Sequence, residues 1–93
     1  MAEITGRERV VAAMKRRYAD GVPVSLILGA FRARILGCPL KEYFSDGKKL
    51  AEGTIAAYER FGHDAVEICW DLMMEAEAIG AELEFPEDSI PQV

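Results

Sequence analysis

The sequence predicts an α/β fold that is rich in helix and contains a small, mostly parallel sheet. Two apolar runs, at residues 22–28 and 65–70, have the length and the branched side chains of buried strands. Between them, residues 48–61 carry apolar side chains at helical spacing. A strand, a helical crossover and a second strand form a βαβ unit, in which the two strands are parallel and the crossover is right-handed.

The first element along the chain is expected to be an amphipathic helix over residues 5–18. Thr5 and Glu8 stand three residues apart in the pattern of a capping box, in which each side chain accepts a hydrogen bond from a backbone N–H of the other residue. An apolar stripe follows at intervals of four residues, and it consists of Val10, Met14 and Tyr18. This helix therefore needs another surface to cover its apolar face.

Short helices are expected after the first strand, over residues 30–37 and 39–44, because Gly29 ends the apolar run. Asp46 is then a suitable N-cap for the crossover helix. Gly62 follows the last apolar position of that helix, where glycine is preferred.

The last elements are a helix over residues 73–79, which Gly80 ends, and an edge strand over residues 81–85 with period-two alternation. We therefore treat residues 1–93 as one domain. It consists of the helix at 5–18, the βαβ unit at 22–71, and the helix and edge strand at 73–85.

Composition narrows the classes of function. The net charge is −5, and residues 64–93 carry nine acidic side chains and no basic one, which argues against a nucleic-acid partner. No apolar run is long enough to span a membrane and no signal peptide is present, so a cytoplasmic location is expected. The basic side chains near the N-terminus are expected to form a solvated helix face; they are Arg7, Arg9, Lys15, Arg16 and Arg17.

Several stretches of the sequence, taken in their order along the chain, resemble the N-terminal part of the uroporphyrinogen decarboxylase superfamily. The stretches are Thr-Gly-Arg-Glu-Arg-Val at 5–10, Val-Pro-Val at 22–24, Phe-Gly-His-Asp-Ala-Val at 61–66, Glu-Ala-Glu-Ala-Ile-Gly-Ala-Glu-Leu-Glu-Phe at 75–85, and Ile-Pro at 90–91. Within that superfamily, the sequence most resembles the branch that contains methylcobalamin:coenzyme M methyltransferase-like proteins.

The resemblance implies a TIM (β/α)8 barrel, of which this chain would supply the N-terminal βα units. A complete barrel takes about 250 residues, so the barrel is expected to be incomplete in this chain. The chain is then either a piece of a longer protein or a truncated relative that stands alone. An open sheet edge would favour a homo-oligomer.

The activity that the resemblance implies is transfer of a methyl group from a methylated corrinoid, or a corrinoid protein, to a thiol. Zinc and the methylcorrinoid belong to the complete family enzyme, and this chain alone is expected to bind no cofactor and to be inactive. Two alternatives stay open: a uroporphyrinogen decarboxylase of tetrapyrrole biosynthesis, and a small oligomeric binding or assembly module without enzymatic activity.

Asp71 is the first candidate site residue. It follows the apolar run 65–70, and ligands of parallel α/β proteins bind at the carboxyl ends of the strands. By resemblance it matches an aspartate that contacts the substrate pyrrole nitrogens in the decarboxylases. Asp71 is also well suited to cap the helix at 73–79, so both roles remain possible.

Arg32 and Arg34 are the other substrate-binding candidates. They follow the first strand, where the resemblance places a pair of arginines that hold substrate carboxylates, and a guanidinium matches a carboxylate with two hydrogen bonds. The decarboxylase pattern Arg-Gln-Ala-Gly-Arg is absent, because residues 28–34 read Leu-Gly-Ala-Phe-Arg-Ala-Arg. A solvated surface pair is the alternative interpretation.

The residues that could bind a metal do not have the spacing of a metal site. The spacing of His63, Cys38 and Cys69 does not support a zinc site, and the His-x-Cys motif of the methyltransferase branch is missing. We expect the two cysteines to be reduced and packed. Met73 and Met74 either line an apolar pocket or pack against the rest of a barrel.

Overall fold

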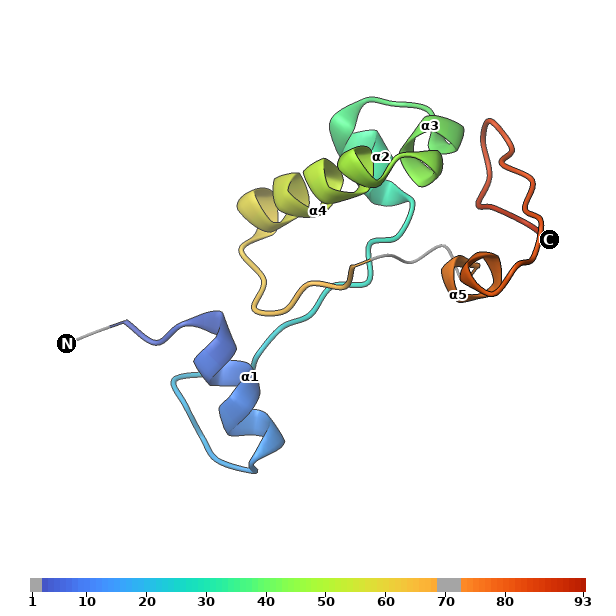
Figure 1. Cartoon of the computed structure of the whole chain (residues 1–93). Helices are drawn as coiled ribbons and strands as arrows, with labels where there is room; N and C mark the ends of the chain where they lie inside the picture. Colours follow the sequence, from blue (N-terminus) through green and yellow to red (C-terminus); the bar gives the residue numbers. More distant parts are fainter. Residues whose placement is uncertain (1–2, 69–72) are drawn as a thin grey trace.

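The computed structural model describes residues 3–68 and 73–93. Five helices lie in that part of the chain (Figure 1); they are α1 (Gly6–Met14), α2 (Phe31–Leu36), α3 (Leu40–Ser45), α4 (Gly47–Phe61) and α5 (Met74–Ala78). Two stretches of irregular, extended backbone run beside each other under these helices. We call residues 22–28 the first extended segment and residues 63–68 the second extended segment.

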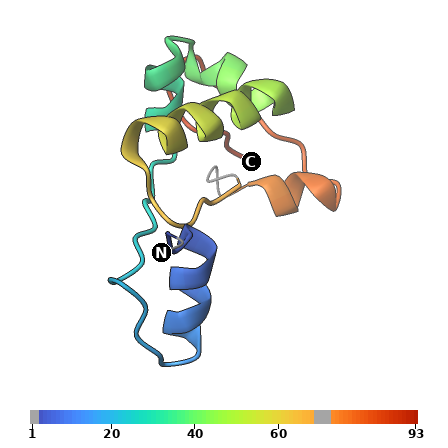
Figure 2. The same cartoon turned by 90° about the vertical axis from the view of Figure 1, so that its left-hand side faces the viewer.

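The protein is elongated. Helices α2, α3 and α4 form one layer over the extended segments, whereas α1 stands apart at one end and α5 lies at the other (Figures 1 and 2). The radius of gyration is 15.9 Å and the extents are 49 × 29 × 17 Å. A compact chain of this length has a radius of gyration of about 12 Å. The layers therefore enclose only a small core and leave much apolar surface uncovered.

The two buried strands that the sequence predicts are not formed within the described residues. The extended segments meet at a single parallel bridge, between Ser25 and Ala65. The carbonyl of Val24 accepts hydrogen bonds from the backbone N–H groups of Asp64 (2.8 Å) and Ala65 (3.3 Å). The two segments run parallel, as the predicted βαβ unit requires, but among the described residues they are paired only at this bridge.

Missing cover explains why the ladder is short. Parallel strands are stable where both faces of the sheet are buried, and within residues 3–68 and 73–93 no helix or strand covers one face of the segments. Val22 is 84% exposed as a result. The predicted edge strand at 81–85 is likewise reduced to one antiparallel bridge, between Glu84 and Gln92. Residues 69–70 of the second predicted strand lie outside the described residues.

The helices after the first extended segment confirm the sequence prediction. Asp46 caps α4, since its Oδ1 accepts a hydrogen bond from the N–H of Lys48 at 2.9 Å. Gly62 ends α4 in the left-handed conformation, with φ of 62°. Helices α2, α3 and α5 form within two residues of their expected limits. Capping and turn residues therefore define both ends of α4 locally.

Helix α1 begins as predicted and ends earlier. Thr5 and Glu8 form the expected capping box, with the Thr5 N–H donating to Glu8 Oε2 at 2.7 Å and the Glu8 N–H donating to Thr5 Oγ1 at 3.2 Å. The predicted limit at residue 18 is wrong, because the helix ends at Met14.

A Schellman-type turn causes this early end. The N–H of Arg17 donates to the carbonyl of Ala12 at 2.8 Å, and the N–H of Arg16 donates to that of Ala13 at 3.0 Å. Arg16 occupies the left-handed position of the turn with φ of 56°. Tyr18 therefore falls outside the helix, and the apolar stripe predicted from the sequence is not continuous.

The core lies between α2, α3 and α4. Ala33, Tyr43 and Phe44 are buried, and the rings of Tyr43 and Phe44 meet edge to face at 5.1 Å between centroids. Helix α4 approaches them through Gly53, where a Cβ atom would lie 2.7 Å from Cε2 of Tyr43. Partly buried apolar side chains surround this core; they are Ala30, Leu36, Cys38, Leu40, Leu50, Phe85 and Ile90.

An ionic network attaches α1 to the extended segments. Arg9 donates to Asp64 Oδ1 at 2.8 Å and to both carboxylate oxygens of Asp20, at 2.6 and 2.9 Å. Asp64 Oδ2 also accepts the backbone N–H of Val24 at 2.8 Å. The expectation of a fully solvated basic face is therefore wrong for Arg9. The hydrogen bond from Val24 and the guanidinium of Arg9 hold the pKa of Asp64 below its ordinary value.

The close approach at Gly53 leads to a stability prediction. We expect Gly53→Ala to destabilise the fold by about 1–3 kcal/mol, because the new methyl group overlaps the Tyr43 ring in a packed layer. Gly47→Ala is the matched control: no atom lies near its Cβ position, so it should be neutral or stabilising by at most about 1 kcal/mol. Urea unfolding followed by circular dichroism measures both, and equal stabilities would contradict the packing of α4 on α3.

The lowered pKa of Asp64 predicts acid sensitivity. In the folded protein the pKa of the Asp64 carboxyl is lower than its ordinary value of 3.8. The charged carboxylate therefore stabilises the fold fully at pH values above 3.8, and this stabilisation is lost as the pH falls through the lowered pKa of the folded state. We expect the melting temperature to drop steeply below about pH 4, and Asp64→Asn to be less stable at pH 7 with a shallower acid decline. Asp88→Asn is the control, and an unchanged acid profile in Asp64→Asn would refute the assignment.

Candidate functional site

The carboxyl ends of both extended segments point toward the same end of the molecule. There the first segment leads into α2, and α5 and the C-terminal residues lie beyond the second segment (Figure 1). The parallel bridge between Ser25 and Ala65 fixes this common direction. In parallel α/β proteins this is the end where ligands bind. Asp71, the first candidate, follows the second segment and lies outside the described residues, so its role stays a prediction.

Arg32 lies inside the protein, between α2, α4 and the extended segments. It is 2% exposed. It donates to Glu67 Oε1 at 2.8 Å and to Thr54 Oγ1 at 3.2 Å. Glu67 Oε1 also accepts the backbone N–H of Leu28 at 3.0 Å. This one oxygen therefore connects the two extended segments with α2.

Arg34 points to a different surface. Two positions along a helix correspond to a rotation of about 200°, so Arg32 and Arg34 leave α2 on nearly opposite faces. Arg34 is exposed, and its guanidinium has no hydrogen-bond or ion-pair partner among the described residues, whereas its backbone carbonyl accepts the N–H of Gly37 at 3.2 Å. The two candidates are therefore not brought together as a pair.

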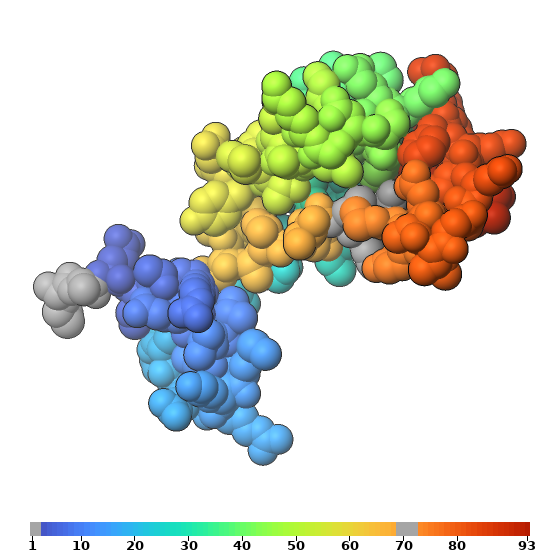
Figure 3. Space-filling model, in the orientation of Figure 1, coloured from blue at the N-terminus to red at the C-terminus, as the bar shows by residue number. Residues whose placement is uncertain are grey.

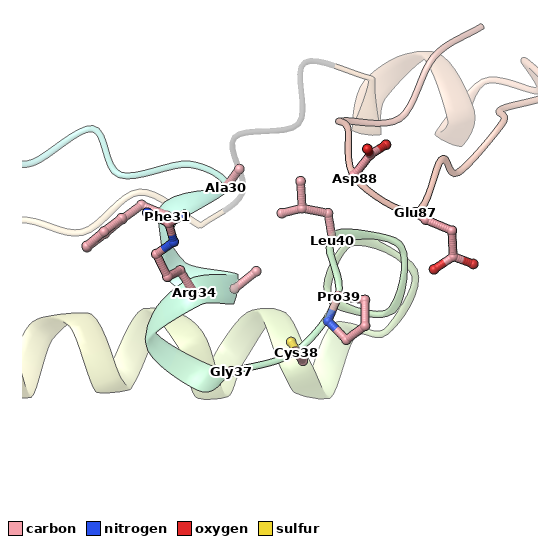
Figure 4. A pocket seen from close by; sticks show the side chains of 10 residues that line it. Ala30, Phe31, Arg34, Gly37, Cys38, Pro39, Leu40, Glu87 and Asp88 are labelled. Atoms are coloured by element: carbon pink, nitrogen blue, oxygen red, sulfur yellow. The ribbon is translucent and has the colours of Figure 1, made fainter.

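Arg34 lines an open hollow of about 550 Å³ beside α2 (Figure 4). Ala30, Ala33 and Leu40 give it an apolar surface, and the turn that carries Glu87 and Asp88 lies at the other end. The volume is in the range of small-molecule sites. A guanidinium that has no partner among the described residues can, at such a place, bind a single carboxylate, sulfonate or phosphate.

The described residues do not fit the zinc that the family resemblance implies. No group of three histidine, cysteine or acidic side chains is close enough to hold a metal ion in residues 3–68 and 73–93. His63 is buried at the amino end of the second extended segment, where its ring meets Tyr58 edge to face at 5.8 Å. Cys38 follows α2, and Cys69 lies outside the described residues. The expectation that this chain alone binds no zinc stays a prediction, and no reaction step is assigned to zinc.

The methionine candidates fall at the start of α5. Met73 is the N-cap residue of that helix, and Met74 lines an apolar groove together with Leu50 and Val66. Met74 therefore contributes to an apolar surface and not to the hollow beside Arg34.

Sequence reasoning missed Glu67 and Thr54. Glu67 is the one charged residue within the apolar run 65–70, and a charge in a buried segment requires a partner. That signal was available in the sequence. Its partner could not be identified, since Arg32 and Arg34 are equally placed in sequence and only the helix geometry distinguishes them.

Comparison with known proteins gives one result. A family model described as Uroporphyrinogen decarboxylase (URO-D) matches residues 5–93. No curated protein and no solved structure matches the chain. Within the described ranges, none of the helices is long and apolar enough to cross a membrane.

The different positions of the two arginines can be tested by stability. We expect Arg32→Gln to destabilise the fold by about 2–3 kcal/mol, because Glu67 is left with a poorly compensated charge between the segments. Arg34→Gln should change the free energy of unfolding by less than about 0.5 kcal/mol, since it removes no interaction among the described residues. Urea titrations of both variants measure the difference. Equal effects would contradict the ion pair between Arg32 and Glu67.

Proposed function

The chain belongs to the uroporphyrinogen decarboxylase family, and from this premise we propose that it forms the N-terminal part of a methyltransferase. The proposed reaction moves a methyl group from a methylated corrinoid to a thiol. Membership of this family implies a TIM-barrel fold. The two parallel extended segments, which are joined through α2, α3 and α4, are compatible with the first βα units of that barrel.

The observation that carries the choice of reaction is the ion pair between Arg32 and Glu67. The decarboxylases that the sequence resembles use two arginines in this region to hold substrate carboxylates. Here Glu67 neutralises Arg32 inside the protein at 2.8 Å, which leaves Arg34 as the available guanidinium of the two. Glu87 and Asp88 line the same hollow and would repel further carboxylates. This arrangement supports a substrate with few negative charges over a porphyrinogen with many.

In the proposed reaction, the thiolate sulfur supplies the electron pair of the new carbon–sulfur bond. A bound methylcorrinoid would supply the methyl group and keep the electron pair of the broken carbon–cobalt bond, and the thiol proton would be released to solvent or to a base. In this proposal Arg34 binds a negative group of a substrate at the carboxyl end of the first extended segment. Asp71 is proposed to contact substrate at the carboxyl end of the second, and the helix-cap role remains the alternative.

A second candidate function is a small oligomeric binding or assembly module. The observation that favours it is the large apolar surface left open along α4 and the second extended segment. Ninety-three residues also cannot close an eight-stranded barrel, which takes about 250. We therefore expect no turnover from the 93-residue chain alone.

The reaction can be tested with the full-length protein that the natural open reading frame encodes. Methylcobalamin and a panel of thiols are the substrates, and mass spectrometry of the thioether together with the corrinoid absorption spectrum measures transfer. We expect thioether formation, and a loss of about 10–100-fold in kcat/KM for Arg34→Gln, because the charge that binds the substrate is removed.

Incubation with uroporphyrinogen III is the second arm of the same experiment, with porphyrin products separated by chromatography. Decarboxylated products, or a failure to form any thioether, would contradict methyl transfer. Thioether formation by the 93-residue chain alone would refute the expectation that it is inactive.

A further inference from the structure

A small hollow lies on α1, at the opposite end of the molecule from α5. Its volume is about 260 Å³. All of the residues that line it lie between positions 7 and 18, so they belong to α1 or to the turn that follows. Figure 3 shows this part of the chain, in blue, set apart from the helix layer. The hollow is therefore formed by this segment alone.

The turn after α1 gives the hollow its second wall. The N–H of Arg17 donates to the carbonyl of Ala12 at 2.8 Å, and Arg16 takes the left-handed conformation that reverses the chain. The Tyr18 hydroxyl then donates to the carbonyl of Asp20 at 3.2 Å. These contacts fold Arg17 and Tyr18 back beside the last turn of the helix, where both side chains line the hollow.

Three of the side chains that line the hollow are cations without an acidic partner. Arg7, Lys15 and Arg17 are exposed, and their charged groups have no hydrogen-bond or ion-pair partner among residues 3–68 and 73–93. Glu8 also lines the hollow, and its Oε2 accepts the N–H of Thr5 at 2.7 Å in the capping box. Three cations and one carboxylate leave a net charge of +2 here, in a chain of net charge −5.

The neighbouring Arg9 shows that a basic side chain of α1 can serve the fold. It binds Asp20 and Asp64 and does not line the hollow. The three cations in the hollow form no such contact among the described residues. Like charges around one hollow repel each other, and an anion between them removes this repulsion. The arrangement is therefore that of an anion site.

Volume and spacing define the class of anion. The hollow is slightly smaller than the roughly 300–1,000 Å³ of typical small-molecule pockets, so it suits a compact ion. A guanidinium binds two phosphate oxygens at once, and an ammonium group binds phosphate as a point charge. Arg7 and Lys15 are eight residues apart, which corresponds to about 12 Å along the helix axis. An anion with two phosphoryl groups can reach toward both ends, whereas a single phosphate is shorter.

We propose that the hollow on α1 binds a diphosphate group. Arg7 contacts it at one end, and Lys15 and Arg17 contact it at the other. The diphosphate is either the free ion or the terminal group of a small molecule such as a nucleoside diphosphate, since both present the same chemistry. The site is separate from Arg34 and independent of the methyl-transfer proposal.

Two neighbouring arginines provide a matched test in the full 93-residue chain. Isothermal titration calorimetry with inorganic pyrophosphate is performed at low ionic strength, where charges are least screened. We expect Arg17→Gln to raise the dissociation constant at least ~3-fold, because it removes a charged hydrogen-bond donor of the site. Arg16→Gln removes the same charge from the adjacent exposed position, which does not line the hollow, so its effect should stay below ~2-fold. Lys15→Gln should weaken binding as Arg17→Gln does.

Orthophosphate and ADP are the further probes. Orthophosphate should bind at least ~3-fold more weakly than pyrophosphate, because it reaches fewer of the cations. ADP that binds as tightly as pyrophosphate supports a diphosphate carried by a larger molecule, and weaker ADP binding supports the free ion. In NMR titrations with pyrophosphate, the amide signals of residues 7–18 should shift and those of α4 should not.

Three results overturn the proposal. The first is no pyrophosphate binding by the wild type at millimolar concentration. The second is an equal loss of affinity in Arg16→Gln and Arg17→Gln, which would show attraction by net charge alone. The third is equal affinity for orthophosphate and pyrophosphate, or NMR shifts that lie outside residues 7–18.

Discussion

The arrangement of this protein depends on one carboxylate oxygen, Oε1 of Glu67. It accepts a hydrogen bond from the buried guanidinium of Arg32 in α2 and from the backbone N–H of Leu28 in the first extended segment. Arg32 in turn reaches Thr54 on α4. Charge-assisted hydrogen bonds of this kind are roughly twice as strong as neutral ones, and their loss would leave a poorly compensated charge inside the protein. The position of the helix layer over the segments follows from this contact.

A second carboxylate performs the same task at the other end of the segments. Asp64 binds Arg9 and the N–H of Val24, as Glu67 binds Arg32 and the N–H of Leu28. Both acids come from the second segment, and both accept a backbone N–H of the first. Side-chain carboxylates therefore hold the two segments in parallel where a ladder would normally do so, and one backbone bridge between them is sufficient. The cost of this arrangement is acid sensitivity, since the network at Asp64 requires a charged carboxylate.

The features that the sequence predicted correctly rest on contacts between residues close together in the chain, and those that it missed rest on contacts between distant residues. The capping box at Thr5, the cap at Asp46 and the end of α4 at Gly62 are local, and all three are confirmed. The strands were predicted from apolar runs. Such a run pairs into a parallel ladder only when other elements cover both faces of the sheet, and the run itself does not show whether those elements are in place. The pairings of Arg9 with Asp64 and of Arg32 with Glu67 span 55 and 35 residues, so no local pattern could identify them.

The candidate site shows the same limit. The motif Arg-Ala-Arg at 32–34 predicts two equivalent cations, yet the helix directs one into the interior and the other into an open hollow. The buried arginine serves the fold because it has a carboxylate partner, and the exposed arginine is available to a ligand because it has none among the described residues. In the proposed site at the carboxyl end of the segments, one guanidinium of the two is therefore available among the described residues, and the substrates proposed for it carry few negative charges. The ion pair between Glu67 and Arg32 thus connects the elements of the fold and underlies the selectivity proposed for the site.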